Sequence, residues 1–161
     1  MRIGVTAARA LNERGEQNIT AALADVAGTA EMVITGGAIG GDAFAARCAH
    51  GLRLWVRTIF PLSVKEVDPD WRLYADEAEG PYEYRERNER IVDQCSVLYA
   101  FPAFPEDHPR SRRSGTWLTI RMARKAGKPV KLWVQDPGPS RGAALAKSST
   151  RLDKPRGGGL R

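Results

Sequence analysis

The glycine-rich segment Ile34–Asp42 (ITGGAIGGD) is the strongest candidate for binding chemistry. Its glycines let the backbone turn sharply and let a ligand approach without meeting a Cβ atom. We expect a helix to start at Asp42, where the amides and dipole of its first turn favour an anion, most naturally a phosphate. Asp42 either caps this helix or contacts the ligand. The alternative is a tight turn whose glycines serve packing alone. The predicted residues of this turn are Gly36, Gly37, Gly40, Gly41 and Asp42.

A second candidate turn lies in the segment Arg110–Thr116 (RSRRSGT). Ser114 or Thr116 can cap the helix that follows, and Gly115 opens the backbone at its start. The three arginines of the segment either pair with phosphate oxygens or lie in solvent. The pattern predicts a second anion-binding turn made of Ser114, Gly115 and Thr116.

A third polar group stands at the start of a predicted helix, where Arg87 and Asn88 occur in the segment Tyr82–Glu89 (YEYRERNE). A first helical turn prefers acidic residues, so arginine at this place indicates an anionic partner. The glutamates of the same segment are an internal alternative to that partner.

The net charge of +6 is concentrated at one end of the 161-residue chain. Residues 135–161 hold six basic and two acidic residues, which leaves residues 1–134 close to neutral. The same segment is rich in Pro, Gly and Ser and lacks apolar periodicity. We therefore expect one domain over residues 1–134, followed by a basic, flexible tail over 135–161.

Composition excludes several classes of protein. A hydrophobic content of 42% and a charged content of 27% are ordinary for a soluble globular domain, and no apolar stretch approaches the roughly 20 residues of a membrane span. Cys48 and Cys95 lack the spacing of a zinc site, so we expect free thiols, no metal and no membrane association. The N-terminal residues do not form a signal peptide, and we expect a cytoplasmic protein.

Strand and helix patterns alternate along residues 1–134. Short β-branched or apolar runs predict strands at 2–6, 31–35, 54–60, 96–101 and 129–134. Helical spacing predicts helices at 13–27, 42–50, 83–93 and 116–126, and a long connection is expected at 62–81. This alternation predicts an α/β fold: an open Rossmann-like parallel sheet of five or more strands with helices on both faces. Ligands of such sheets bind at the carboxyl ends of the strands, which is where the candidate turns fall.

Three stretches resemble the SLOG superfamily, which includes the YpsA-like, DprA-like and LOG (lysine-decarboxylase-like) proteins. They are GGAIGGD from Gly36, RERNERIVDQCSVLYAF from Arg85 and SGTWLTIRMARKAGKPVKL from Ser114. In addition, VTAAR at Val5–Arg9 is similar to the first-strand VTGSR of the YpsA-like branch. The motifs occur in the family's order, and the resemblance covers about residues 1–134.

The resemblance implies a Rossmann-like domain that binds a nucleotide or a nucleotide-derived ligand, with no separate cofactor. It adds Thr6 and Arg9 in the first loop and Ala38 in the glycine turn, and it places Arg87 and Asn88 toward the ligand. Members often self-associate, so the resemblance leaves a homodimer open. The full predicted binding set is Thr6, Arg9, Gly36, Gly37, Ala38, Gly40, Gly41, Asp42, Arg87, Asn88, Ser114, Gly115 and Thr116.

The sequence departs from the family pattern in the first loop, in the second turn and at one catalytic position. Ala7 and Ala8 replace Gly-Ser, and Arg113-Ser114-Gly115-Thr116 stands in place of a double glycine before the threonine. LOG enzymes, which cleave the N-glycosidic bond of nucleoside monophosphates, carry PGGxGTxxE, and Thr119 stands where that glutamate belongs. No catalytic residue is therefore assigned. The remaining candidate carboxylates are Asp42, Glu83, Glu86 and Glu89.

Three functions remain open from the sequence. The first is binding of a nucleotide-like phosphate ligand, with Trp71, Tyr74 or Trp117 either stacking on a base or packing in the core. The second is an N-glycoside hydrolase of nucleoside 5′-monophosphates, which needs a carboxylate. The third is DprA-like binding of single-stranded DNA, against which the near-neutral body argues.

Overall fold

The computed structural model describes residues 1–138, so most of the predicted tail lies outside the described residues. Strands and α-helices alternate along the described chain, except that two 3₁₀ helices connect the third strand to the fourth. The strands are β1 (Arg2–Ala7), β2 (Met32–Thr35), β3 (Trp55–Pro61), β4 (Glu77–Tyr82), β5 (Val97–Phe101) and β6 (Val130–Leu132). The helices are α1 (Glu13–Val26), α2 (Gly41–Gly51), α3 (Tyr84–Gln94) and α4 (Gly115–Lys125), with short 3₁₀ helices η1 (Val64–Glu66), η2 (Trp71–Leu73) and η3 (Pro109–Arg113).

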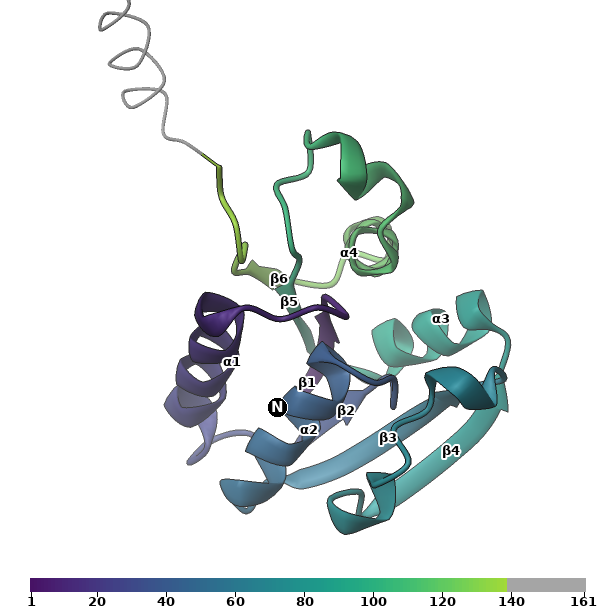
Figure 1. Ribbon diagram of the computed structural model, residues 1–161. Helices are drawn as coiled ribbons and strands as arrows, with labels where there is room; N and C mark the ends of the chain where they lie inside the picture. Colours follow the sequence, from purple (N-terminus) through teal and green to yellow (C-terminus); the bar gives the residue numbers. More distant parts are fainter. Residues whose placement is uncertain (139–161) are drawn as a thin grey trace, which may run out of the picture.

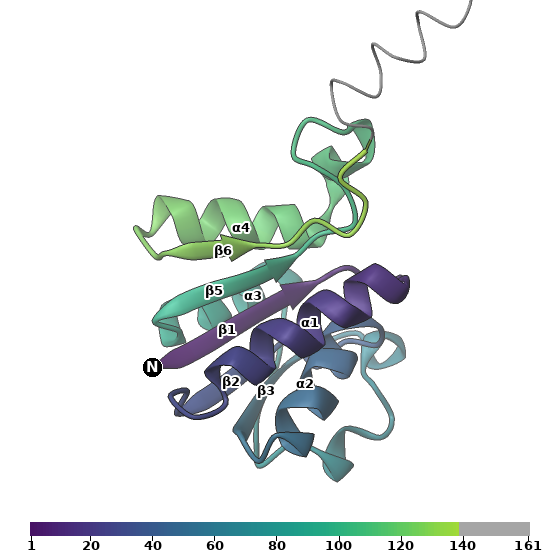
Figure 2. The ribbon, with the colours of Figure 1, turned by 90° about the vertical axis from the view of Figure 1, so that its left-hand side faces the viewer.

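The six strands form one parallel sheet in the order β4-β3-β2-β1-β5-β6. The chain builds the sheet outward from β1 to one edge through β4 and then returns to the other side of β1 with β5. This reversal opens a crevice beyond the carboxyl ends of β1 and β5. Figure 2 shows the arrows of these two strands ending on the same side of the molecule. The predicted Rossmann-like parallel sheet is confirmed.

Two apolar cores form because helices cover both faces of the sheet (Figures 1 and 2). On one face, Ile19 and Leu23 of α1 pack with alanines of α2 against Val5 and its neighbours on the strands. On the other face, Ile91 of α3 and Trp117 of α4 pack against the alternate side chains of the same strands. Burial on both faces explains why the central strands read as nearly continuous apolar runs.

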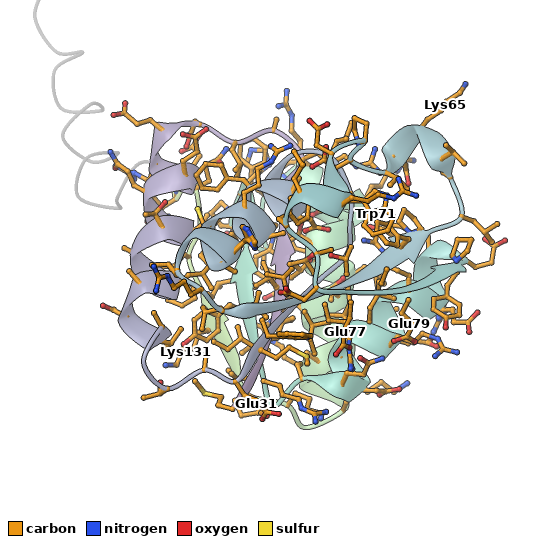
Figure 3. All side chains as sticks on the ribbon, turned by 90° about the horizontal axis from the view of Figure 1, so that it is seen from below. Glu31, Lys65, Trp71, Glu77, Glu79 and Lys131 are labelled. Carbon is orange, nitrogen blue, oxygen red and sulfur yellow. The ribbon has the colours of Figure 1, made fainter. Side chains whose placement is uncertain are left out.

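Strand β4 corrects the sequence analysis, which assigned residues 62–81 to a connection. Its sequence, EAEGPY, has no apolar alternation, and β4 forms an edge of the sheet. Glu77 pairs with Arg57 of β3, and Glu79 accepts hydrogen bonds from Arg90 and Gln94 of α3. Both glutamates lie along this edge (Figure 3). Charged side chains protect an edge strand from further pairing, but they remove the pattern by which strands are recognised.

The described domain extends slightly beyond the predicted boundary at residue 134. The amide of Gln135 donates to the carbonyl of Pro102, and its side chain bonds with the backbone of Ala10 and Asn12. The amide of Asp136 donates to the carbonyl of Ala103. These two residues therefore belong to the domain. None of the helices in the described part of the chain is long and apolar enough to cross a membrane.

Candidate ligand-binding pocket

A cavity of about 690 Å³ lies at the carboxyl ends of β1 and β5, where the crevice is expected. The loop after β1, the glycine turn before α2, the start of α3, and the segment from β5 into α4 contribute its walls. The size suits a small organic ligand. The topology thus brings together segments that are more than 100 residues apart in the sequence.

The glycine turn contributes only part of itself to this cavity. Ala38 and Asp42 line it, whereas the four glycines of the turn do not. A Cβ atom at Gly36 would lie 1.8 Å from Nη1 of Arg87, and one at Gly40 would lie 2.0 Å from the carbonyl oxygen of Arg9. Gly37 and Gly41 are equally confined, by Phe60 of β3 and by the first loop respectively. In the structure the glycines serve close packing, the alternative role that the sequence left open.

Amides of this turn are bonded to the protein itself. The amide of Gly41 donates to the carbonyl of Ala8, and that of Ile39 donates to the carbonyl of Glu66. Ala38 forms an antiparallel bridge with Val67. The turn is thereby joined to the first loop on one side and to the segment after β3 on the other.

The second turn, unlike the glycine turn, lines the cavity with all of its predicted residues. Ser114, Gly115 and Thr116 all line the cavity. The Ser114 hydroxyl caps α4 by accepting from the amide of Trp117 at 3.3 Å. Within residues 1–138, the amides of Gly115 and Thr116 have no hydrogen-bond partner. They stand at the positive end of the helix dipole, a position that favours negative charge.

Arg87 and Asn88 are placed at the cavity, as the resemblance implies, and both are almost fully buried, at 4% and 3% exposure. Nη1 of Arg87 donates to the carbonyl oxygen of Gly36 at 2.9 Å and lies 3.4 Å from Oδ2 of Asp42. Nε of Arg87 and Nδ2 of Asn88 have no partner among the described residues. Both groups are hydrogen-bond donors and can therefore donate to an acceptor bound at the cavity.

Asp42 positions Arg87. Its Oδ1 accepts from the amide of Ala7 at 3.2 Å, while its Oδ2 faces the guanidinium of Arg87. Burial raises the pKa of Asp42 above its ordinary value, and the charge of Arg87 and the Ala7 amide act against that rise. The helix-capping role is not seen, because Gly40 occupies the N-cap position of α2 and no side chain bonds there.

Thr6 and Arg9 also line the cavity. Thr6 is buried at the end of β1, whereas Arg9 is exposed and forms an ion pair with Glu66 of η1. This pair joins the first loop to the segment after β3. Arg9, Glu66 and Asp42 all line the cavity.

The cavity is strongly basic although the body of the protein is nearly neutral. Six arginines and two carboxylates line it. The arginines are Arg9, Arg87, Arg110, Arg112, Arg113 and Arg121, and the carboxylates are Asp42 and Glu66. The sequence argument from overall charge missed this, because acidic side chains on other surfaces offset the arginines gathered here.

Of the candidate catalytic carboxylates, only Asp42 lies in the cavity. Glu83, Glu86 and Glu89 do not line it, and the latter two pair with Arg90 and Arg85 on their own helix. Thr119 lines the cavity but is buried, and its hydroxyl donates to the carbonyl of Gly115 at 3.0 Å. Both carboxylates that line the cavity among the described residues, Asp42 and Glu66, lie in ion pairs with arginines.

The three proposed stacking residues all have packing partners. Trp71 packs edge-on against Phe60, and the hydroxyl of Tyr74 donates to Asp68 at 2.8 Å. Trp117 touches the cavity but is buried, and its indole nitrogen donates to the carbonyl of Phe104. The aromatic residues that sequence reasoning missed are Tyr84 and Phe104, which both line the cavity.

Sequence comparison finds no matching family model and no matching curated protein. Structural comparison finds DNA processing protein A from Helicobacter pylori, with 17% identity and a TM-score of 0.65 over 93% of this chain and 73% of that one. DprA from Streptococcus pneumoniae matches with 20% identity and a TM-score of 0.65, over 92% of this chain and 56% of that one. The chain therefore shares a Rossmann-like fold with these proteins.

The molybdenum cofactor binding protein from Rippkaea orientalis shares the same fold, with 20% identity and a TM-score of 0.65 over 92% of this chain and 81% of that one. The H. pylori protein binds single-stranded DNA, so proteins that share this fold accept different ligands. At these identities the likeness establishes the fold alone. The ligand must therefore be argued from the pocket.

Within the described residues, no three histidine, cysteine or carboxylate side chains lie close enough together to hold a metal ion. The groups that face the cavity are mainly hydrogen-bond donors and cations. Such a set suits an anion rather than a cation.

Proposed function

We propose that the protein binds a nucleotide or a nucleotide-derived phosphate ligand in the pocket at the carboxyl ends of β1 and β5. The observation that carries this proposal is the pair of buried, unpartnered donors, Nε of Arg87 and Nδ2 of Asn88. A buried donor without an acceptor costs free energy in the unliganded protein. An anionic ligand that accepts hydrogen bonds from these donors would remove that cost.

The second turn supplies further donors to the same ligand. The free amides of Gly115 and Thr116 and the dipole of α4 favour negative charge at this place. The glycine turn has a different part: it brings Gly36 and Asp42 against Arg87 and so fixes the guanidinium. In this proposal one turn binds the phosphate and the other positions the arginine.

Substitution of Asn88 by leucine tests the proposal. Because Nδ2 of Asn88 has no partner within residues 1–138, Asn88→Leu should leave the unliganded protein as stable as the wild type or more stable. Binding of the best ligand in a calorimetric series of nucleoside phosphates and ADP-ribose should weaken by about tenfold or more.

A matched control is Glu89→Gln, on the same helix but outside the cavity. It should bind as the wild type does. The proposal fails if no phosphate ligand binds the wild type, or if Asn88→Leu binds with unchanged affinity.

The local concentration of arginines favours a second candidate, binding of single-stranded DNA, which the H. pylori relative performs. The near-neutral body no longer argues against it, since charge at the pocket is what a strand would meet. A labelled oligonucleotide should then bind with strong salt dependence to a chain truncated after Gly138. Loss of binding on truncation would assign it to the tail instead.

A further inference from the structure

We infer, resting on the proposed function, that the pocket contains a second anion subsite and that its ligand carries a diphosphate rather than a single phosphate. The subsite is formed by Arg110, Arg112 and Arg113 of η3 together with Arg121 of α4. It lies beside the first subsite, which consists of Arg87, Asn88 and the free amides at the start of α4.

The distribution of ion pairs separates these arginines from the others. Fifteen arginines occur in the described chain, and eight of them pair with a carboxylate. Of the seven that have no carboxylate partner within residues 1–138, four line the pocket. An ordinary solvated surface alternates charge, as α3 does with its pairs Arg85–Glu89 and Arg90–Glu86.

The segment that presents these arginines is held in place. The hydroxyl of Ser111 is buried and donates to the carbonyl of Pro105 at 2.6 Å. Nδ1 of His108 accepts from the amide of Arg110, and the ring of His108 stacks on Phe104 with centroids 4.2 Å apart. The structure thus fixes the backbone that carries these exposed arginines, whose positive charges an anionic ligand would offset.

The arginines of the second subsite are spread along the pocket wall on both sides of the start of α4. Arg112 and Arg113 immediately precede α4, whereas Arg121 lies six residues after Gly115, which corresponds to a rise of about 9 Å along a helix. One phosphate at the free amides would leave most of these cations without a partner. A diphosphate adds a second group with its own negative charge, and guanidinium groups pair well with its oxygens.

The occupant is inferred to be a small molecule, because the subsites share one cavity of about 690 Å³. Both a nucleoside diphosphate group and free pyrophosphate offer this chemistry. The experiment therefore includes both, and an oligonucleotide represents the strand alternative.

The test compares AMP, ADP, inorganic phosphate, pyrophosphate and oligothymidine of increasing length by calorimetry on the full chain. Wild type should bind ADP about tenfold or more tightly than AMP. The double variant Arg112→Gln/Arg121→Gln should lose this preference, so that it binds ADP and AMP with similar affinity. Arg124→Gln removes one charge from the same helix outside the cavity, where Arg124 pairs with Glu106, and should keep the preference.

Each outcome decides a separate point. Equal affinities of wild type for AMP and ADP would overturn the second subsite but leave the proposed function intact. Failure of every phosphate ligand to bind would remove the proposed function itself. Pyrophosphate that binds as tightly as ADP would support the subsite and show that the nucleoside adds little. Affinity that rises steadily with oligothymidine length beyond the dinucleotide would overturn the diphosphate in favour of a strand.

Discussion

The two glycine-containing turns differ in what their backbone amides contact. In the turn before α2, the amides of Ile39 and Gly41 bond to protein carbonyls, and the glycines allow neighbouring groups to approach closely. In the turn before α4, the amides of Gly115 and Thr116 have no partner in the described chain and line the cavity. The turn with more glycines therefore makes more contacts with the protein itself.

This difference shows that a glycine-rich turn indicates only that some group lies close to its backbone. That group can belong to the protein or to a ligand. The glycine turn is closely packed against other parts of the protein. Atoms of Arg87, Phe60 and the loop after β1 take the positions where Cβ atoms would lie. The second turn lies at the start of α4, where only the end of a side chain, the hydroxyl of Tyr84, takes the position of the missing Cβ atom of Gly115. The predictions below test this contrast, in order of decreasing effect on the free energy of unfolding.

Gly40→Ala should destabilise the protein by about 3 kcal/mol or more. Gly40 has a φ of +91°, and a Cβ atom there would lie 2.0 Å from the carbonyl oxygen of Arg9, a backbone atom with little freedom to move. Urea denaturation measures the change. Gly28→Ala, at an open surface position, is the control and should stay within about 0.5 kcal/mol of the wild type. A Gly40→Ala protein of normal stability would refute the packing role.

Asp42→Asn should change the pH dependence of stability. Because burial raises the pKa of Asp42 in the folded state, folded protein holds this proton at pH values where unfolded protein has lost it. The wild type should therefore lose stability relative to Asp42→Asn as pH rises above about 4, by at most about 1.4 kcal/mol per pH unit, until the folded-state pKa is passed. Denaturation curves of both proteins from pH 4 to 8 provide the check. A constant difference would contradict the raised pKa.

Gly115→Ala should change stability by less than about 1 kcal/mol and yet weaken phosphate binding. A Cβ atom there would lie 1.5 Å from the hydroxyl oxygen of Tyr84, the end of a side chain that can turn away into the pocket. Calorimetry on Gly115→Ala should show weaker binding, and Tyr84→Phe/Gly115→Ala should recover part of it. If Gly115→Ala proved as destabilising as Gly40→Ala, the contrast between the two turns would disappear.

The sequence predicted the central strands and all four helices because each carries its own periodic pattern. It missed β4 because the strand's acidic residues acquire their partners, Arg57 and Arg90, only in the folded protein. Of the predicted binding residues, Thr6, Arg9, Ala38, Asp42, Arg87, Asn88, Ser114, Gly115 and Thr116 line the cavity, and the four glycines of the first turn lie behind it. Tyr84, Phe104 and Arg121 line it without having been predicted, since no local pattern distinguishes them from surface or core residues.

The amino-acid sequence by itself determined the alternation of strands and helices, the parallel sheet and the segments that follow its carboxyl ends. Those features depend on the spacing of apolar residues along each segment and on turn-forming residues that are neighbours in the sequence. Only the tertiary structure decided which amides remain free, that Asp42 holds Arg87 and that the unpaired arginines converge on one cavity. These depend on contacts between residues far apart in the chain, where a neighbouring carbonyl or carboxylate determines whether a polar group is available to a ligand.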